Sequence, residues 1–530
     1  MFSHDGNSTA SLRSYKGVWR LAVIVALLQA CYAAGFIART SFTVEGRRYF
    51  CLFDDAMISM RHAANWANGE GWVWNPGERV EGYTNFGWTA IMGSCHLLRL
   101  SPSHTCLLVQ LLGIPILWSC LLATVLLARS CRLLPVSAAC ALVLAATCFN
   151  LNFFTLFGME TGLVTCLVTF ALAESVKAVR RKQGRMACML WFAPALLVRP
   201  DVLPVMIFVL AFLGVTVRKG RLRLASGVVA VAAVVCTHML WRHHYYGQWL
   251  PNTYYLKATG WPLADRIRAG ITHTEWTIVQ FGLPFMLAMF ALVCAKRWHF
   301  LLLGSFATTV AYQLYIGGDA WPLNRFVLPS SLGLFVLAGE GVHRTTAWLV
   351  RQKTHLRGTL VRAGLTLVSI VLINAVHWDH WLLIARPQTA ALNLANIRCV
   401  LATERIADPG ATAAVICAGA FPYFSHRKCF DLLGKCDPYI ARLPANPAVP
   451  SAGHNKFDLP YTFSTYKPDI VLQILDAIHP EFMGCYRPIA VEVDGTPVMF
   501  CVRKDSRRIH GGRLVSWQTL SEWIAKEQGR

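Results

Sequence analysis

Two adjacent carboxylates, Asp54 and Asp55, occur in a polar, aromatic and glycine-rich stretch, residues 39–85, that lies between apolar segments. Adjacent carboxylates at a membrane surface can act as a general base or hold a divalent metal ion. A structural alternative is that Asp55 caps the helix-like run after it, because anions suit a helix N-terminus. The same stretch contains residues that could line a site for a polar substrate, and these are Glu78, Glu81, Tyr83 and Asn85.

Ionisable residues also interrupt the apolar sequence further along the chain. Glu160 follows Gly158-Met159, and Arg199 and Asp201 stand at a break between two apolar runs. Ionisable groups at membrane depth are costly and by default indicate a functional site. The structural alternative for Arg199 and Asp201 is a mutual salt bridge that stabilises the break. We group Glu160 with the substrate-lining residues.

Two later loops offer cations and aromatic side chains. The aromatic residues in 241–260 could anchor the chain at the membrane interface, but this loop also offers polar groups to a ligand. Residues 317–326 place an acid and a base on a glycine-rich turn. A cation near the membrane surface is what a lipid phosphate requires. The candidates for binding a phosphorylated donor are Arg61, Arg199, Asp201, Asn252, Tyr254, Lys257, Asp319 and Arg325.

The composition indicates what positions these residues. The chain of 530 residues is 55% hydrophobic and only 15% charged, with a mean hydropathy of +0.43, whereas soluble domains carry about 25% charged residues. About 20 apolar residues cross a bilayer. We therefore predict a polytopic α-helical membrane protein with about eleven spans, near 21–38, 106–128, 133–149, 153–175, 186–198, 202–217, 224–240, 276–294, 299–316, 326–342 and 360–377. The pieces at 186–198 and 202–217 could instead form one broken helix.

The net charge of +22 could suggest a nucleic-acid partner, but its distribution argues against one. Residues 1–377 carry 33 Lys and Arg against 14 Asp and Glu, and residues 378–530 carry 17 against 14. The excess lies in short loops between spans, at 177–185, 218–223, 296–297 and 344–357, and such clusters mark the cytoplasmic side. This pattern predicts that the first loop, 39–85, lies outside, provided that 86–100 is a re-entrant or interfacial helix.

Residues 378–530 are predicted to form an extracytoplasmic α/β domain after a transmembrane domain of residues 1–377. Short β-rich runs at Ala413–Cys417, Ile470–Ile474 and Met499–Val502 alternate with helical segments. An even count of six cysteines in an exported domain predicts at least one disulfide, with Cys429–Cys436 and Cys485–Cys501 as candidate pairs. Free buried thiols are the alternative. The six are Cys399, Cys417, Cys429, Cys436, Cys485 and Cys501.

Carboxylates, cations and aromatic side chains on one membrane face suit glycosyl transfer from a polyprenyl phosphate. Carboxylates can activate a hydroxyl, cations can stabilise a departing phosphate, and aromatic rings stack on sugars. The same inventory suits a transporter or flippase of lipid-linked sugars, and the residues alone leave both open.

The sequence resembles the polytopic type C glycosyltransferases, most closely the family of the mycobacterial terminal arabinofuranosyltransferase and its bacterial relatives. The similar segments run in order along nearly the whole chain. They are FDDAMISMRHAANWANGEGWVWNPGERVEGYTN (53–85), GMET (158–161), VRPD (198–201), YYGQWLPNTYYLKATG (245–260), GGDAWPLNRF (317–326), AGAFPYFSHRKCFDLLGKCDPYIAR (418–442) and GHNKFDLPYTFSTYKPDIVL (453–472).

The resemblance implies a fold, an activity and a location. It implies a type C glycosyltransferase in the bacterial cytoplasmic membrane that transfers a sugar, with arabinofuranose a candidate, from a polyprenyl-phosphate donor to a cell-envelope glycan with inversion. Asp54, with Asp55 as a close second, would take the place of the acidic catalytic residue. Cys429 and Cys436 depart from the family pattern, which suggests local variation. A divalent metal is possible, and no other cofactor is implied.

Overall fold

The computed structural model describes residues 15–321, 323–350, 355–449, 451–472 and 480–528. The chain divides into two compact units, each built from three separate segments. The first, here called the helical unit, consists of residues 1–36, 111–238 and 266–385. The second, here called the mixed unit, consists of residues 37–110, 239–265 and 386–530. The predicted division of the chain at residue 377 into membrane and extracytoplasmic domains stays a prediction.

Six helices among the described residues are long and apolar enough to cross a membrane, or seven if one bent pair counts as a single span. The bent pair is α6 (Pro135–Thr147) and α7 (Phe149–Leu156), with 47° between them. The six lie in α2 (Lys16–Thr40), α5 (Pro102–Cys131), α8 (Thr161–Arg181), α12 (Arg221–Tyr246), α14 (Leu263–Ala291) with η2 (Leu292–Cys294), and α17 (His355–Asn374) with η3 (Ala375–His377) and α18 (Trp378–Trp381).

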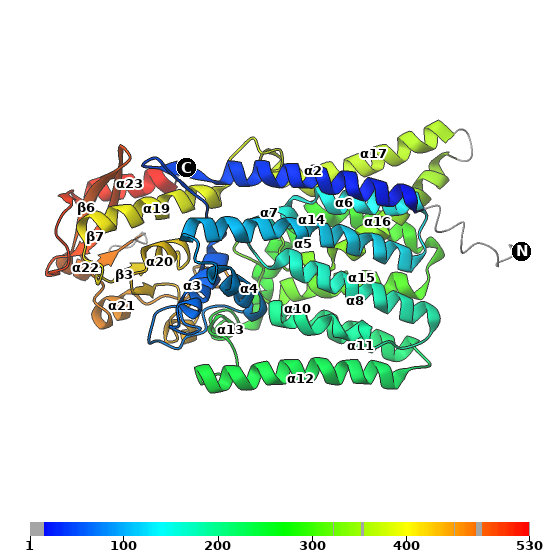
Figure 1. The fold of residues 1–530 in the computed structure, drawn as a ribbon, viewed down its shortest axis with the longest axis horizontal. Coiled ribbons are helices and arrows are strands. Elements are labelled where there is room, and N and C mark those ends of the chain that lie inside the picture. The colour runs from blue at the N-terminus through cyan, green and yellow to red at the C-terminus, as the bar shows by residue number, and fades with distance from the viewer. Residues whose placement is uncertain (1–14, 322, 351–354, 450, 473–479, 529–530) are drawn as a thin grey trace, which may run out of the picture. The chain divides into compact units, whose positions relative to one another are not determined.

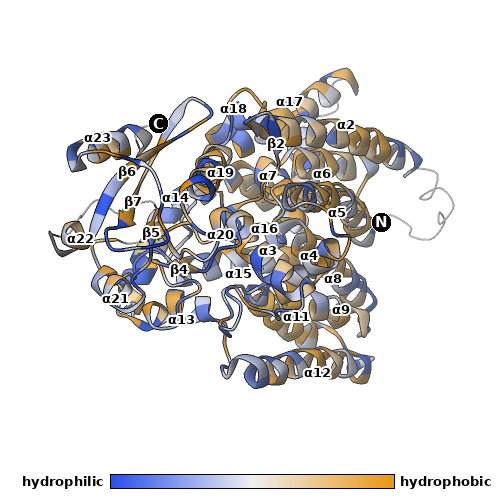
Figure 2. Cartoon of the chain, turned by 60° about the vertical axis from the view of Figure 1, so that its left-hand side comes forward, coloured by the Kyte–Doolittle hydropathy of each residue, from blue (hydrophilic) through white to orange (hydrophobic). Residues whose placement is uncertain are grey.

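Several of these helices expose large apolar side chains, as a helix in contact with lipid does. In α2, Val23, Leu27 and Leu28 are each more than 60% exposed. Figure 2 shows α2 and α5 as mainly hydrophobic ribbons. Because water would disfavour such surfaces, the exposure supports a chain that crosses the membrane several times. The predicted polytopic helical fold is confirmed.

Four other predicted spans form helices that are not among the six. The run at 186–198 forms the short helices α9 (Ala187–Leu190) and α10 (Phe192–Val198), and 202–217 forms α11 (Leu203–Thr216) after the 3-10 turn η1 (Pro200–Val202). The segments at 299–316 and 326–342 lie in α15 (Arg297–Tyr315) and α16 (Leu328–Val350), which are not among the six. The predicted continuous span at 153–175 is wrong, because the chain breaks between α7 and α8, where Gly158 has a φ of +76°.

Helix α16 is the centre of the helical unit. It packs against α6, α8, α15 and α17, and these helices lie side by side in Figure 1. Its residues from Leu328 to Gly339 are all buried. Small residues permit close approach, since a Cβ on Gly339 would lie 2.3 Å from the Ser137 oxygen and one on Gly341 would lie 1.8 Å from the Leu287 oxygen. Arg351 and Lys353 of the last basic cluster lie outside the described residues.

The mixed unit contains a six-stranded sheet in the order β4-β3-β5-β7-β6-β8. The strands β3 (Ala413–Val415), β4 (Cys429–Asp431) and β5 (Ile470–Val471) are parallel, whereas β6 (Tyr486–Val493), β7 (Thr496–Arg503) and β8 (Arg513–Leu514) join antiparallel. These strands confirm the predicted runs at 413–417 and 499–502. The run at 470–474 is β-structure at its start, and its residues 473 and 474 lie outside the described ones.

Alternation along the strands buries both faces of this sheet. Ala413, Val415 and Ile470 face one core, which also includes Ile58 and Trp74 from the first loop. Ala414, Val471 and Cys501 face a second core with residues of α22 (Pro480–Cys485) and α23 (Trp517–Gln528). Successive strand residues point to opposite faces, so each short strand contributes to two cores.

The first loop belongs to the mixed unit and is well structured. It contains the hairpin β1 (Phe42–Val44) and β2 (Arg47–Tyr49) and the helix α3 (Asp54–Ala67), and it is followed by α4 (Phe86–His96). Helix α4 has only 11 residues, too few to span a bilayer. The unit is completed by α13 (Asn252–Ala258), α19 (Gln388–Ile406), α20 (Ala420–Ser425), η4 (Ile440–Arg442) and α21 (Leu459–Thr465).

All eighteen cysteines lie among the described residues and none of them forms a disulfide, so the predicted disulfide in 399–501 is wrong for this structure. The geometry gives the reason. The Cys429 thiol lies 3.5 Å from the Arg427 oxygen, and the Cys436 sulfur packs against Gly82. In the hairpin of β6 and β7, Cys501 is opposite Pro488, whereas Cys485 is hydrogen-bonded through its oxygen to Lys504.

Candidate functional site

Asp54 and Asp55 form the first turn of α3, and a lysine from a distant part of the chain approaches them. Lys435 Nζ lies 3.1 Å from Asp55 Oδ1, in an ion pair whose lysine side chain is 11% exposed. The backbone N–H of Gly419 donates to Asp54 Oδ1 at 3.2 Å. Both carboxylates remain half-buried. All four residues belong to the mixed unit, which therefore contains an acid pair and a cation in contact.

The start of α3 is not capped by either carboxylate. The N-cap is Phe53, and it makes no side-chain capping hydrogen bond. The interpretation of Asp55 as the N-cap is therefore wrong, because the helix begins two residues earlier than that interpretation requires. Both carboxylates instead lie in the first turn, where the helix dipole still favours negative charge.

The close approach of Gly419 fixes the position of Asp54. A Cβ on Gly419 would lie 2.3 Å from the Asp54 backbone oxygen and 2.5 Å from Asp54 Oδ1. Only glycine fits at such a distance. Nearby, Trp74 Nε1 donates to the Ala418 oxygen at 3.1 Å. The residues before α20 therefore pack directly against the first turn of α3 and present an N–H to Asp54.

The turn after β4 positions Lys435. The buried Asp431 accepts hydrogen bonds from the backbone N–H groups of Leu433 and Cys436, at 2.9 and 2.7 Å. Asn252 Nδ2 lies within 3.1 Å of the oxygens of Gly434, Lys435 and Asp437. Asp431 thus closes the turn on one side and Asn252 holds its carbonyls on the other. Asn252, predicted to contact the donor, acts here as a positioning residue.

The local electrostatics favour a proton acceptor at Asp54. The pKa of Asp54 is raised to about 6, mainly because the carboxyl group is buried. The charges of Asp55 and Asp431 also raise this pKa, whereas Lys435 and the Gly419 N–H lower it. Burial lowers the pKa of Lys435, but the nearby carboxylates together raise it by more than burial lowers it, so the pKa lies above its ordinary value. These carboxylates belong to Asp55, Asp54 and Asp431. Lys435 is therefore a permanent cation. A carboxyl group with a pKa near 6 suits proton transfer near neutral pH.

A second loop of the mixed unit, residues 453–456, lies close to these groups. A Cβ on Gly453 would lie 3.0 Å from Lys257 Cε. Burial lowers the pKa of His454 to about 4; Lys435 and Lys257 lower it as well, and Asp55 raises it. His454 is thus a neutral imidazole in the field of Asp55 and two lysines. Lys456 Nζ donates to the oxygens of Tyr255 and Ala441, at 2.9 and 2.8 Å, and ties the loop to α13.

The other predicted residues of the first loop have structural partners. Glu81 forms an ion pair with Arg242 at 2.7 Å, with both side chains at most 5% exposed. Burial raises the pKa of Glu81 to about 7, and Arg242 lowers it. The Tyr83 hydroxyl lies 3.1 Å from that of Tyr246, and Asn85 Oδ1 accepts from Ser59 at 2.9 Å.

Two further predicted residues in the mixed unit make structural contacts, and a third is exposed. Arg61 is buried, and its guanidinium donates to the oxygens of Trp74, Pro422 and Arg427. Glu78 is 42% exposed and pairs with Lys428. Tyr254 is exposed. Arg61 is therefore bound to the protein's own backbone, and its contact with a donor phosphate stays a prediction.

The predicted residues of the helical unit form two ion-pair groups. Arg199 Nη1 lies 3.1 Å from Glu160 Oε1, and the same guanidinium also pairs with Asp201. Arg325 Nε lies 2.7 Å from Asp319 Oδ2, with both side chains at most 7% exposed. The salt bridge between Arg199 and Asp201 at the helix break, the structural alternative in the sequence analysis, is present.

The sequence analysis missed Lys435, Asp431, Gly419 and His454. Each lies in a segment that was noted only for its resemblance, 418–442 or 453–472. A usable signal was the run Asp431–Asp437, where an acid, a glycine and a second acid within seven residues indicate a tight turn. No group of three or more His, Cys, Asp or Glu in the described part of the chain is arranged to hold a metal ion.

Comparisons with known proteins bear mainly on the fold. Residues 387–518 match a family model described as "Domain of unknown function (DUF8728)". No curated protein sequence matches the chain. Among solved structures, ArnT from Cupriavidus metallidurans in the apo state is similar with a TM-score of 0.56 at 12% identity, covering 92% of this chain and 98% of that one.

Two further solved structures resemble the chain. ArnT from Cupriavidus metallidurans bound to undecaprenyl phosphate gives a TM-score of 0.51 at 12% identity, over 78% of this chain and 86% of that one. The oligosaccharyltransferase of Archaeoglobus fulgidus in the apo form gives 0.50 at 12% identity, over 80% and 65%. The fold that these structures share with the chain is the type C glycosyltransferase fold. No match singles out the mycobacterial arabinofuranosyltransferase family. The chain is thus a multi-pass membrane protein with the type C glycosyltransferase fold and a C-terminal region that contains a β-sheet.

Proposed function

We propose that this protein is a glycosyltransferase that uses a polyprenyl-phosphate sugar as its donor. The observation that carries the proposal is that Asp54 and Asp55, in the first loop, contact Gly419 and Lys435 from a later part of the chain. The chain that holds this contact has the type C glycosyltransferase fold. The similar ArnT structure was solved with undecaprenyl phosphate, which supports the same class of donor here.

In the proposed reaction, Asp54 is the general base. Its carboxylate accepts the proton of an acceptor hydroxyl, and the hydroxyl oxygen attacks the anomeric carbon of the donor sugar. The bond between that carbon and the phosphate oxygen breaks, and the electron pair leaves with polyprenyl phosphate. Attack opposite to the leaving group inverts the anomeric centre. A pKa near 6 keeps most of Asp54 ionised at pH 7 while leaving it basic enough to accept a proton.

Asp55 and Lys435 have a supporting role in this proposal. Lys435 is held by Asp55 at 3.1 Å, and its positive charge keeps the neighbouring Asp54 ionised. Substituting Asp55 therefore acts on Asp54 through Lys435, whereas substituting Asp54 removes the base itself.

The departing phosphate is assigned to Lys257. This residue belongs to α13 in the mixed unit, close to Gly453 and within the electrostatic influence of His454. Arg199 and Arg325, the other predicted phosphate contacts, are already engaged with carboxylates in the helical unit. Of the three, Lys257 is the one that belongs to the same unit as Asp54 and Asp55.

The sugar, acceptor and location are extensions of the proposal. The resemblance of residues 53–85, 418–442 and 453–472 to the arabinofuranosyltransferase family supports arabinofuranose as the sugar and a cell-envelope glycan as the acceptor. The basic clusters support a first loop and C-terminal region outside the cytoplasmic membrane. Reporter fusions at Gly260 and Gly410 should then show external activity and one at Gly220 should not; an external signal at Gly220 would contradict this orientation.

The test of function is turnover by purified protein in detergent. The donor is a synthetic polyprenyl-phosphoryl arabinofuranose, and the measured product is polyprenyl phosphate released in the presence of a cell-envelope glycan acceptor. We expect Asp54→Asn to lower the rate by about 10²–10⁴-fold, the usual contribution of a general base. A transporter moves its substrate between two membrane leaflets, so it would show no turnover in detergent.

A matched control separates chemistry from charge. Asp494→Asn removes the same charge at an exposed position with a φ of +52°, a conformation that Asn accepts well. This variant should keep the full rate. Equal rates for the native protein, Asp54→Asn and Asp55→Asn would eliminate the first loop as the catalytic centre. Absence of turnover with every polyprenyl-phosphate pentose would eliminate arabinofuranose and the other pentoses as the sugar, and absence of turnover with polyprenyl-phosphate hexoses as well would eliminate the proposed donor class.

A further inference from the structure

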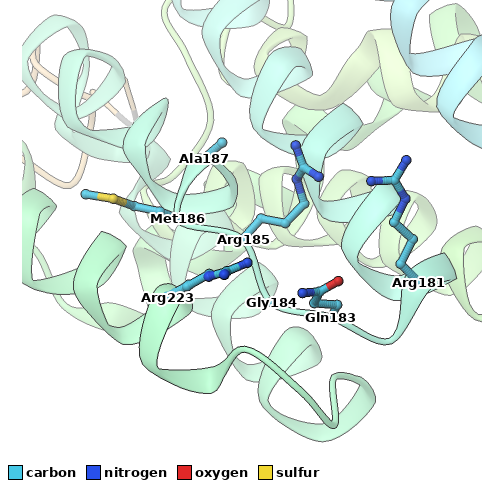
Figure 3. A pocket seen from close by; sticks show the side chains of 7 residues that line it. All are labelled: Arg181, Gln183, Gly184, Arg185, Met186, Ala187 and Arg223. Carbon is cyan, nitrogen blue, oxygen red and sulfur yellow. The ribbon is translucent and has the colours of Figure 1, made fainter.

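The helical unit contains a pocket that the proposed reaction does not use. It has a volume of about 270 Å³ and is lined by Arg181 at the end of α8, by residues 183–187, and by Arg223 in the first turn of α12. Figure 3 shows Arg181, Arg185 and Arg223 around it. Ligand sites for drug-sized molecules measure roughly 300–1,000 Å³, so this pocket suits a smaller group.

The walls of the pocket are rigidly joined. Gly184 N donates to the Lys219 oxygen at 2.7 Å, and the N–H groups of Arg218 and Lys219 donate to the Lys182 oxygen at 3.1 and 3.2 Å. Cβ atoms on Gly184 and Gly220 would lie 2.5 and 2.7 Å from the opposite glycine's oxygen. The loop after α8 and the loop before α12 are thus joined backbone to backbone.

The pocket has an excess of positive charge. Glu174, the acid near it, is already shared by Lys177 at 2.6 Å and Arg185 at 2.8 Å. Arg181 and Arg223 are exposed, and neither makes an ion pair or a side-chain hydrogen bond with any described residue. Two guanidinium groups therefore face a small cavity with their donors available. Guanidinium groups bind phosphate oxygens with paired hydrogen bonds.

Apolar side chains around the pocket identify the source of the phosphate. Leu222, between Arg221 and Arg223, is 87% exposed, and Met186, Leu190 and Trp191 are also exposed. Helices α8 and α12 are both long and apolar enough to span a membrane, so the pocket lies where two such helices end. A free anion in water would gain nothing from this apolar rim, whereas the acyl chains of a lipid would cover it.

We propose that this pocket binds the phosphate headgroup of an anionic membrane lipid. The positive-inside rule places basic loops 177–185 and 218–223 on the cytoplasmic side, so the lipid would come from the inner leaflet. The phosphate oxygens bind Arg181 and Arg223, and the acyl chains lie along Leu222 and Trp191. This inference is independent of the proposed chemistry at Asp54.

The test is native mass spectrometry of the full chain, released from detergent micelles that contain equal amounts of phosphatidylglycerol and phosphatidylcholine. We expect one retained phosphatidylglycerol. In the double variant Arg181→Gln/Arg223→Gln, its occupancy should fall about tenfold or more, as expected when charge-assisted hydrogen bonds are lost. The control is Lys182→Gln/Arg221→Gln, which removes the same charge from exposed neighbours that do not line the pocket and should retain the lipid.

A second variant removes space instead of charge. Ala187 lines the pocket, and Ala187→Phe should lower lipid occupancy with every arginine still present. Equal loss of lipid in the two double variants would mean general electrostatic attraction and would overturn the proposal. Equal retention of phosphatidylcholine, or displacement of the lipid by millimolar inorganic phosphate, would overturn it as well. Circular dichroism of each variant identifies any that is misfolded, and the remaining variants still decide the question.

Discussion

Replacing Lys435 by Met should shift the pH dependence of turnover to higher pH. Lys435 lowers the pKa of Asp54, which burial raises to about 6. An opposite charge within a few ångströms shifts a carboxyl pKa by about 1–3 units, so without the lysine the pKa of Asp54 should reach roughly 7–9. The base must be ionised, and activity is therefore lost on the acidic side of this higher value.

The size of the effect at neutral pH follows from these values. With a pKa of about 6, roughly 90% of Asp54 is ionised at pH 7, and with a pKa of 8 roughly 10% is. Turnover at pH 7 should thus fall about tenfold and return at pH 9. The assay is release of polyprenyl phosphate between pH 5 and 10. Lys428→Met is the control, because it removes an exposed ammonium that also pairs with a carboxylate.

One result would refute this reasoning. If Lys435→Met lowers turnover equally at every pH and leaves the acidic limb near pH 6, Lys435 does not control the ionisation of the base. Lys435→Arg keeps the charge and should retain the native acidic limb, even if its longer side chain lowers the rate. A folded Lys435→Met protein with native activity at pH 7 would remove Lys435 from the mechanism.

The remaining predictions concern stability. The pKa of folded Asp54, about 6, lies above its ordinary value of 3.8, so the folded state loses stability as pH rises from about 4 to 6. Asp54→Asn should abolish this pH dependence in thermal melts. At pH 7 the variant should be more stable than the native protein by roughly 3 kcal/mol. Gly419→Ala should destabilise the protein by about 1–3 kcal/mol, the cost of overpacking, and should impair turnover. Gly410→Ala should do neither, because a Cβ at that position would meet no atom within 4 Å. Equal melting temperatures for the two variants would contradict the close approach of Gly419 to Asp54. The pKa of folded Glu81, about 7, also lies above its ordinary value of 4.5, so stability should fall as pH rises from about 4.5 to 7. Glu81→Gln should remove this dependence in chemical denaturation, whereas Glu78→Gln at an exposed pair should change the stability by less than about 1 kcal/mol.

Several spans and three of the six strands of the sheet could be predicted from sequence because their signals are local. A run of apolar residues identifies α2, α5, α12 and α17 without knowledge of their neighbours. The break at Arg199–Asp201 was equally visible, since charges interrupt the apolar pattern. The break between α7 and α8 was not, because Gly158 stands among apolar residues and its positive φ leaves no trace in hydropathy.

The partners of the acid pair could not be predicted, because they depend on the fold of the mixed unit. Nothing near Asp55 in the sequence indicates that its cation is Lys435, and the cations named from the sequence, Lys257 and the arginines, were predicted as phosphate contacts. Arg61, close in sequence, turned out to hold three backbone oxygens. The cysteine count predicted a disulfide, but pairing depends on strand register, which places Cys501 opposite Pro488.

The contact between Asp55 and Lys435 also constrains how the protein is made. The two residues are 380 positions apart, and a ribosome adds about 5–20 residues per second. Roughly 20–80 s therefore separate the synthesis of the acid pair from that of its cation. During that interval the nascent chain must insert its membrane helices with two adjacent carboxylates lacking their lysine. A chain that stalls before β4 therefore lacks Lys435, and under the proposed mechanism its acid pair would have no cation.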